Sequence, residues 1–316
     1  MISKDAKKKM KVIDLKSRFD KLVKYRVSTG IVAFDKVIGG GIPSGRYTEF
    51  FGGESTAKSR LCGHILAETQ KIGGIAVLVD TEKSMGEGLI ELTGIDLENL
   101  IYPDPEEIVT IEDVFELVEY VSTEMREEFP DVPITFVWDS LASSPGMEDM
   151  EKEIGRNEAG MRRAKIIGEG LKKYMPMVYK NQICLIIVNQ VRDKMNVMFG
   201  DKTDVPGGRQ VKHWASLRLG MKVIGSVKDK DTKEQVSTKV QLLVRKSRVC
   251  KPFGIVNLDI PVDEPINKYS GLLDYLKRHG EIDNKGKYYF FTDNPETTFL
   301  KDDFPKIYEE RNGRKK

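Results

Sequence analysis

The sequence predicts an α/β protein with a mostly parallel central sheet, a helical segment ahead of it and a small α+β region after it. Between residues 30 and 260, apolar runs alternate with amphipathic helical segments, and runs such as 75–79 and 183–188 are apolar throughout. Strands whose two faces are both covered by helices have this pattern, which is typical of parallel sheets. A glycine-rich turn after residue 51 joins one such strand to a helix. That connection places ligands at the carboxyl ends of the strands.

The first 29 residues contain an amphipathic segment. Its apolar positions, set among lysines and aspartates, are Val12, Leu15, Phe19, Leu22 and Val23. A helix with one apolar face needs an apolar partner. The core of its own chain is one such partner, and a neighbouring subunit is the other. We predict an N-terminal helical oligomerisation segment over residues 1–29.

Residues 30–265 form the predicted core, and residues 266–316 form the predicted C-terminal domain. Core strands are expected at 46–51, 75–80, 133–138, 183–188, 214–223, 238–246 and 254–260, and core helices at 58–71, 112–127 and 159–178. Toward the C-terminal side of the core the helices stop and strands follow one another, which predicts an antiparallel edge of the sheet. The small α+β domain is expected to contain a helix at 272–278, an aromatic strand at 288–291 and a last helix.

The composition excludes several classes of protein. The net charge is only +2, from 51 basic and 49 acidic residues, so no global field requires a nucleic-acid partner and the local charge distribution must carry that argument. Both termini are basic, and they can be either solvated tails or binding arms. Cys62, Cys184 and Cys250 lie far apart in apolar segments, which favours reduced thiols over disulfides or a zinc site. Without a signal peptide or a membrane-spanning run, we expect a soluble cytoplasmic protein with no membrane partner.

The turn at residues 52–59 reads Gly-Gly-Glu-Ser-Thr-Ala-Lys-Ser, one residue short of a strict phosphate-binding loop. Such a loop directs backbone N–H groups and a helix N-terminus at a polyanion. Lys58 would reach the β- and γ-phosphates of a nucleotide, and the Ser59 hydroxyl would bind Mg²⁺. The strict pattern has glycine where Ala57 stands; alanine is the smallest departure and is harmless where that residue has a negative φ. The alternative is a Ser/Gly turn that caps an ordinary helix.

The predicted nucleotide-binding residues are Gly52, Gly53, Glu54, Ser55, Thr56, Ala57, Lys58, Ser59 and Arg60. Polar side chains end three other predicted strands. Asp139 would orient Mg²⁺ together with Ser59. Glu82 would polarise the water that attacks the γ-phosphate, and Gln190 would sense that phosphate. Because the carboxyl ends of parallel strands meet at one edge, we expect these groups to converge on one crevice.

Further motifs, along nearly the whole chain, resemble the RecA family of recombinases. The start of the family's ATPase core is matched by residues 28–30, 34–35 and 39–46, and the start of its first DNA-binding loop is matched by residues 153–155. Its second DNA-binding loop and the flanks of that loop are matched by residues 189–194, 197–200, 207–208 and 215–219. The start of its C-terminal domain is matched by residues 269–274. Lys246-Ser247-Arg248, before Pro252-Phe253, resembles the basic pair that reaches the nucleotide of a neighbouring subunit. The second-loop motif together with the basic pair is more specific than the phosphate loop.

The resemblance implies a RecA-type P-loop ATPase core that binds ATP and Mg²⁺. It makes Glu82 the catalytic carboxylate, and it makes Gln190 the link between the γ-phosphate and the order of the second loop. Lys246 and Arg248 would act on a neighbouring subunit's phosphates, so the active site would be complete only in a polymer. Without the family, a solvated strand edge is the alternative for this pair.

The second-loop segment also has a physical reading as a DNA site. Its cations can hold phosphates, Met198 and Phe199 can wedge between bases, and its glycines permit a loop that is mobile until DNA orders it. Contacts of this kind are largely independent of sequence; the alternative is a solvated charged loop. The predicted DNA-binding residues are Arg162, Arg163, Arg192, Lys194, Met198, Phe199, Gly207, Gly208, Arg209, Lys212 and Arg218.

The chain departs from the family at several positions. Ala57 replaces the usual glycine, Gly86 and Leu89 fall near the positions that usually hold the adenine, and His213 replaces an aromatic residue important for communication between subunits. The C-terminal domain is short and ends in basic residues. These departures suggest a phage-type or otherwise divergent member.

The function that the resemblance implies is an ATP-dependent homologous recombinase. Such a protein forms helical filaments on single-stranded DNA, hydrolyses ATP in a DNA-dependent way and pairs the strand with a homologous duplex, with single-strand-binding or mediator proteins as further partners. One alternative is a RecA-fold regulatory or loading ATPase without strand exchange, whose turnover ignores DNA. Another is a nucleotide-gated DNA-binding scaffold that barely hydrolyses ATP; Lys58, Glu82 and Asp139 argue against it.

Overall fold

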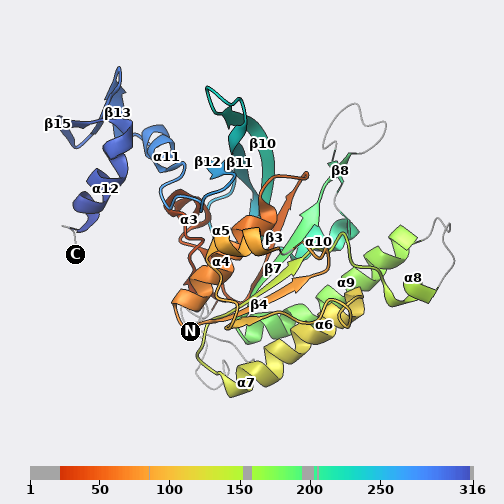
Figure 1. Cartoon of the computed structure of the whole chain (residues 1–316). Helices are drawn as coiled ribbons and strands as arrows, with labels where there is room; N and C mark the ends of the chain where they lie inside the picture. The colour runs from red at the N-terminus through yellow and green to blue at the C-terminus, as the bar shows by residue number, and fades with distance from the viewer. Residues whose placement is uncertain (1–21, 85, 152–158, 194–202, 205, 314–316) are drawn as a thin grey trace, which may run out of the picture.

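The computed structural model describes residues 22–84, 86–151, 159–193, 203–204 and 206–313. Its centre is an eight-stranded sheet with the order β12-β11-β10-β3-β7-β6-β4-β5 (Figure 1). The strands are β3 (Arg46–Gly52), β4 (Ile75–Asp80), β5 (Leu100–Ile101), β6 (Ile134–Asp139), β7 (Cys184–Gln190), β10 (Leu217–Lys228), β11 (Gln235–Ser247) and β12 (Ile255–Pro261). Most of the predicted oligomerisation segment, residues 1–21, lies outside the described residues.

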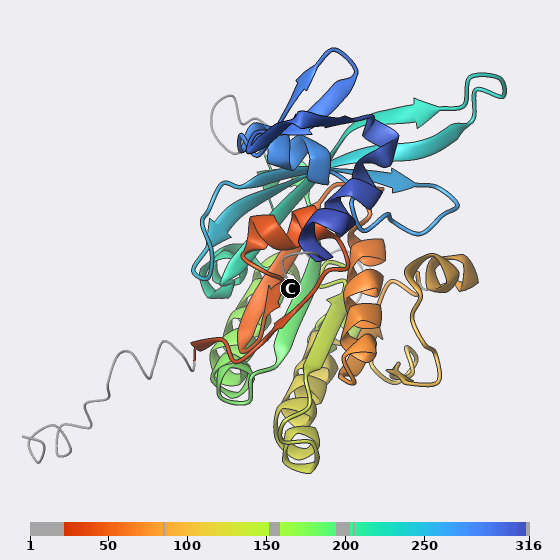
Figure 2. The same cartoon turned by 90° about the vertical axis from the view of Figure 1, so that its left-hand side faces the viewer.

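The sheet is mostly parallel, as the sequence predicts. The pairs β10–β3, β3–β7, β7–β6, β6–β4 and β4–β5 are all parallel. β11 runs antiparallel to both β10 and β12 and so forms the expected antiparallel edge. Figure 2 shows the hairpin of β10 and β11 extending well past the helices of the core. Because the six parallel strands point the same way, their carboxyl ends meet at one edge, where the polar strand tips lie.

Helices cover the two faces of the sheet and divide the core into two clusters. α4 (Lys58–Lys71) packs on one face, and α6 (Ile111–Tyr120) and α9 (Ala159–Lys180) pack on the other (Figure 1). Along β4, Ala76 and Leu78 join the α4 cluster, whereas Val77 and Val79 join the cluster of α6 and α9. This alternation is the two-residue period of a strand, and it explains why residues 75–79 are apolar throughout.

Shorter elements complete the core. They are β1 (Arg26–Val27), α3 (Val32–Ile38), β2 (Ile42–Pro43), α5 (Glu87–Thr93), a π-helix (Val121–Met125), α7 (Arg126–Glu128), α8 (Met147–Glu151), β8 (Arg192–Asp193), β9 (Thr203–Asp204) and α10 (Gly208–Trp214). The helix expected at 112–127 is therefore an α-helix that passes through a π turn. α3, α5 and α10 have seven residues each, too few for a periodic pattern to stand out. No helix in the described part of the chain is both long and apolar enough to cross a bilayer.

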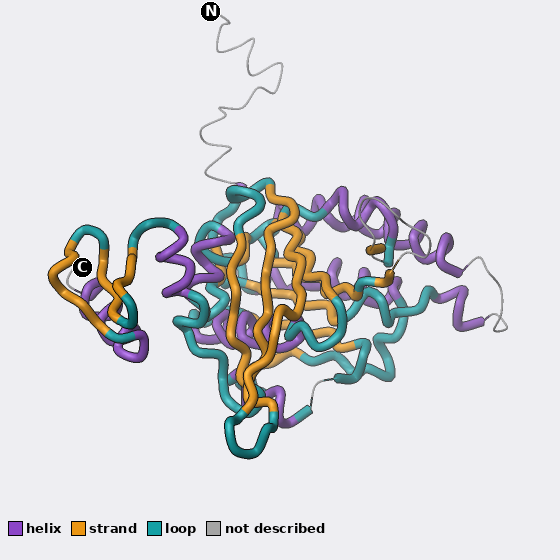
Figure 3. Tube along the Cα trace, turned by 90° about the horizontal axis from the view of Figure 1, so that it is seen from above, coloured by secondary structure: helices purple, strands orange, loops and turns teal. Residues whose placement is uncertain are grey.

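The C-terminal region is a small α+β unit, as expected. It contains α11 (Leu272–Arg278), β13 (Ile282–Lys285), β14 (Tyr288–Phe291), β15 (Asn294–Phe299), a 3-10 turn (Lys301–Asp303) and α12 (Phe304–Gly313). Its three strands form a separate antiparallel sheet, seen beside the core in Figure 3. Leu272, Leu276 and Phe304 belong to the same hydrophobic cluster as α4. The unit is therefore packed onto the core, and its exact boundary at 265/266 stays a prediction.

Candidate nucleotide and DNA site

The glycine-rich loop joins the end of β3 at Gly52 to the start of α4 at Lys58. Gly52 tolerates no side chain, because a Cβ there would lie 2.4 Å from the carbonyl oxygen of Met221. The first residues of α4 leave their N–H groups without partners inside the helix, and these point into the loop. The predicted strand–loop–helix connection is therefore present, with the helix N-terminus facing an anion site.

Ala57 differs from the expectation drawn from its sequence position. Its φ is +63° and its ψ is 26°, in the left-handed region. The condition under which alanine would be harmless, a negative φ, is not met. A residue with a Cβ is strained by about 1 kcal/mol or more in this region, which gives a physical reason for the glycine of the strict loop pattern.

Lys58 is buried in the loop and faces its backbone. Its Nζ donates to the carbonyl oxygens of Gly53 at 2.7 Å and Gly52 at 3.1 Å, and to Thr56 Oγ1 at 3.3 Å. Burial lowers the pKa of the Lys58 ammonium, and the nearby carboxylates of Asp139 and Glu82 oppose this shift. The side chain therefore places a positive charge inside the curve of the loop, where phosphate oxygens would replace the carbonyl oxygens as acceptors.

The metal side of the site consists of Ser59 and Asp139. Asp139 is 4% exposed; burial raises the pKa of its carboxyl to about 6, and a hydrogen bond with Ser59 opposes that shift. A hydroxyl and a carboxylate in contact are hard oxygen ligands that fit Mg²⁺. The described residues contain no cluster of three or more His, Cys, Asp or Glu that could hold a metal alone. This fits Mg²⁺, which takes its other ligands from phosphates and water.

The carboxylate of Glu82 is contacted by residues at the ends of two strands, β7 and β6. Gln190, at the end of β7, donates from Nε2 to Glu82 Oε1 at 2.8 Å. Ser140, directly after β6, donates from Oγ to the same oxygen. The phosphate loop and three strand tips thus converge, as expected, on one pocket of about 460 Å³. It is lined by Glu54, Ser55, Thr56, Ala57, Lys58, Ser59, Arg60, Glu82, Leu89, Asp139 and Gln190.

Arg60 lines this pocket, but its guanidinium is bonded elsewhere. The Nη1 and Nη2 groups donate to the carbonyl oxygens of Pro261 and Glu264. These carbonyls follow β12, so the side chain ties the first turn of α4 to the segment that leads into the C-terminal unit. A nucleotide contact of Arg60 stays a prediction, and its backbone N–H in the first turn is the group best placed for it.

The basic pair lies against the end of α10. Lys246 Nζ donates to the carbonyl oxygens of Lys212 at 2.7 Å and His213 at 2.8 Å, and Arg248 Nη2 donates to that of His213 at 3.1 Å. Burial and the positive charges of Arg248 and Arg218 lower the pKa of Lys246 to about 8, although Glu49 acts in the opposite sense. Cations stabilise a helix C-terminus. The action of this pair on a neighbouring subunit stays a prediction.

The second loop begins and ends in a short antiparallel ladder. Arg192 pairs with Asp204, and Asp193 pairs with Thr203. Lys194, Met198 and Phe199 lie outside the described residues. At the far end, Gly207 has a φ of +90°, and a Cβ there would lie 2.5 Å from Val211. This positive φ and the lack of room for a Cβ explain the glycine at the N-cap of α10.

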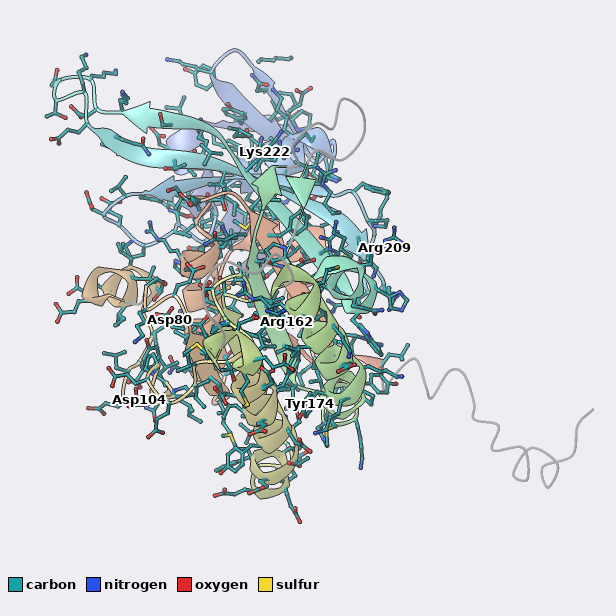
Figure 4. All side chains as sticks on the ribbon, turned by 90° about the vertical axis from the view of Figure 1, so that its right-hand side faces the viewer. Asp80, Asp104, Arg162, Tyr174, Arg209 and Lys222 are labelled. Carbon is teal, nitrogen blue, oxygen red and sulfur yellow. The ribbon has the colours of Figure 1, made fainter. Side chains whose placement is uncertain are left out.

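Apart from Arg218, the remaining predicted DNA contacts lie on two helices, α10 and α9. Gly208 and Lys212 lie on α10 with Arg209, which is exposed; Figure 4 shows Arg209 and Arg162 from the same side of the molecule. Arg162 forms an ion pair with Asp149 at 3.0 Å. Arg163 donates to the carbonyl oxygens of Ala142, at 3.3 Å, and Ser144. These two arginines thus already hold parts of the fold together.

Arg218 belongs to the sheet. Its side chain is 12% exposed, donates to the fully buried Glu49 and lies over the ring of Phe51 at 4.4 Å. A buried carboxylate needs such a cation, so Arg218 stabilises the sheet, and its contact with DNA stays only a prediction.

Ser140 is the residue that the sequence analysis missed; its signal was its position directly after Asp139.

Comparisons with known proteins match most of the chain to one family. A model of the RecA N-terminal domain matches residues 2–267. The chain is 34% identical over 283 residues to Protein RecA of Aquifex aeolicus, which covers 89% of this chain and 78% of the relative. The identity to Protein RecA of Rubrobacter xylanophilus is 33% over 266 residues, which cover 84% of this chain and 74% of that relative. The identity to Protein RecA of Heliobacterium modesticaldum is 30% over 272 residues, which cover 86% of this chain and 75% of that relative. The chain therefore belongs to the RecA family of recombinases.

Proposed function

We propose that this chain hydrolyses ATP at the described pocket while polymerised on single-stranded DNA, and that the filament pairs that strand with a homologous duplex. As a RecA-family member, the chain is a recombinase of DNA repair and recombination and a DNA-dependent ATPase that binds nucleotide and DNA and forms filaments. The proposal concerns Mg²⁺, strand pairing and the residues that carry the activity. One observation supports it above the others: Glu82 Oε1 accepts hydrogen bonds from Gln190 at 2.8 Å and from Ser140.

The chemistry follows from these positions. The loop N–H groups and Lys58 hold the phosphates of ATP, while Ser59 and Asp139 hold Mg²⁺, which would neutralise charge on the phosphate oxygens. Glu82 orients the attacking water and accepts its proton. Gln190 contacts Glu82 and leads directly into the second loop, so loop order and carboxylate position change together. Lys246 and Arg248 of an adjacent subunit supply the remaining positive charge.

The DNA side of the proposal rests on the segment around the second loop. It comprises Arg192, Lys194, Met198 and Phe199, with Gly207, Gly208, Arg209 and Lys212 at the start of α10. The exposed Arg209 and the helix that follows the loop support a contact with phosphates. Single-strand-binding and mediator proteins are proposed partners, because both act on the same DNA strand.

The test is ATP hydrolysis by the purified protein with and without single-stranded DNA, with Lys58→Ala as the matched variant. We expect strong stimulation by DNA and loss of turnover in the variant, because Lys58 neutralises the phosphates in the transition state. Turnover that ignores DNA would favour the regulatory ATPase. ATP-dependent DNA binding without turnover would favour the scaffold.

A further inference from the structure

Four hydroxyl side chains form a hydrogen-bonded cluster behind Glu82. Thr81 Oγ1 lies 2.8 Å from Ser143 Oγ and donates to the carbonyl oxygen of Ser140 at 2.9 Å. Ser144 Oγ lies 3.2 Å from Thr81 Oγ1 and 3.1 Å from the Ser140 carbonyl oxygen. The backbone N–H of Ser140 donates to Thr81 Oγ1 at 3.1 Å. We call Thr81, Ser140, Ser143 and Ser144 the hydroxyl cluster.

One end of the hydroxyl cluster reaches Glu82. Ser140 is fully buried, and its Oγ donates to Glu82 Oε1, the oxygen that also accepts from Gln190. None of the hydrogen bonds between described residues involves Glu82 Oε2. A carboxylate whose one oxygen is held by two donors keeps a fixed orientation, and Glu82 lines the pocket. Ser140 therefore acts on the orientation of Glu82.

The other end of the hydroxyl cluster reaches α9. Arg163, in the first turn and a half of that helix, donates to the carbonyl oxygens of Ala142, at 3.3 Å, and Ser144. On the adjacent side of α9, Arg162 pairs with Asp149 of α8 at 3.0 Å. The turn after β6 is thus fixed to the helix that follows the predicted first DNA loop. A shift at the start of α9 must move this turn or break these bonds.

We infer that Ser140 and Arg163 are positioning residues that transmit the state of α9 to the Glu82 carboxylate, a second link between DNA and ATP hydrolysis besides Gln190. The inference rests on the proposed function, since it takes Glu82 as the residue that orients the attacking water. It adds two residues that are not among those lining the pocket. The Arg163 guanidinium is committed to backbone carbonyls, so its main effect is on rate and not on DNA affinity.

Steady-state ATP hydrolysis with and without saturating single-stranded DNA tests this link. For Ser140→Ala we expect kcat to fall about tenfold to a hundredfold, because a small misplacement of a reacting group has effects of this size. The KM for ATP should stay within about twofold, because the phosphate contacts are untouched. For Arg163→Ala we expect the plateau of DNA stimulation to fall, and Arg163→Lys should restore part of the plateau.

Lys165→Ala is the matched control for charge. It also removes one cation from α9, but its Nζ is exposed and lies 4.0 Å from Glu169, away from the hydroxyl cluster. We expect its plateau of stimulation to match the wild type. A half-saturating DNA concentration that rises in Arg163→Ala with an unchanged plateau would overturn the inference and make Arg163 a simple DNA contact.

Tryptophan fluorescence gives a readout that does not depend on turnover. The chain has two tryptophans, and the indole N–H of the buried Trp138 donates to Ser144 Oγ at 3.0 Å. In a Trp214→Phe background, adding single-stranded DNA and a slowly hydrolysed ATP analogue should change Trp138 emission, and Arg163→Ala should abolish the change. No change in the parent protein would overturn the inference. Glu82→Gln separates the proposed function from this inference. Full ATPase activity in that variant would refute the role of Glu82, whereas an intact Trp138 response would still support the link to α9.

Discussion

Two regions next to the predicted DNA loops reach the same oxygen of Glu82, and they do so in different ways. On the second-loop side, the strand itself ends in Gln190, and one bond of 2.8 Å joins it to Glu82 Oε1. On the first-loop side, Arg163 donates to the carbonyl oxygen of Ser144 in the turn after β6. Ser140, in the same turn, donates to the same Glu82 oxygen. The direct link can switch by the movement of one side chain. The indirect link requires a turn and a helix to move together.

The direct link is also tied to both ends of its loop. Only Val191 separates Gln190 from β8, whose partner β9 closes the ladder. The neighbouring Asn189 is fully buried and donates from Nδ2 to the carbonyl oxygen of Pro206 at 3.0 Å, where the chain returns. Ordering the loop therefore acts on the end of β7 from both sides. This arrangement favours Gln190 as the stronger of the two links.

Glu82→Gln should have the largest effect, because both links end on this carboxylate. The amide keeps the shape of the side chain but cannot accept a proton from water, so kcat should fall by about 10²- to 10⁴-fold. Nucleotide binding, measured with a fluorescent ATP analogue, should persist because Lys58 and the loop are unchanged. DNA-stimulated turnover near the wild-type rate would show that neither link matters for hydrolysis.

Gln190→Ala should separate the two links. We expect the ratio of DNA-stimulated to basal turnover to fall about tenfold or more, since the variant cuts the direct bond. Ser140→Ala should lower turnover without DNA as well, because Ser140 holds Glu82 in either state, and only the stimulation that passes through Gln190 should remain. Combining the two changes in a double-mutant cycle measures their coupling. Because both donors serve Glu82 Oε1, we expect clear non-additivity; additive effects would mean that they act on separate steps.

The sequence predicted that Gln190 and Glu82 converge on one crevice, but it did not predict the contacts of Ser140 and Arg163, for a physical reason. Gln190 ends an apolar strand, and strand tips meet at one edge whatever the loops do. Ser140 and Arg163 act through a turn whose hydrogen bonds depend on three-dimensional closure, which periodicity does not reveal. The same limit explains Arg218: the parallel register of β10 and β3 sets it opposite Glu49, and no local pattern gives that register. The strand at 75–80 and the helix at 58–71 were predicted to the residue.

A pH profile probes the basic pair, which touches the end of the helix that the second loop leads into. Because the pKa of Lys246 is lowered to about 8, its ammonium is charged below that pH and becomes neutral as the pH rises through it. The kcat/KM for ATP should therefore decline above about pH 8, since this parameter reports groups of the free enzyme. Lys246→Arg keeps its charge to above pH 12 and should remove this alkaline limb. Identical limbs in the two proteins would exclude Lys246 as their source and weaken its role on the second-loop side.

Ala57→Gly should have the smallest effect and serves as a control for the comparison. With φ at +63°, the alanine is strained, and glycine removes the strain at the cost of a more disordered unfolded chain. We expect a net gain of about 1 kcal/mol in the free energy of unfolding, measured as a higher urea midpoint. Ala67→Gly, within the same helix α4, should change stability by a similar amount in the opposite direction. Because the phosphate loop serves both links equally, the ratio of DNA-stimulated to basal turnover should not change in Ala57→Gly. A change in that ratio would mean that the loop itself takes part in one link, and that Gln190 and Ser140 are not separable from it.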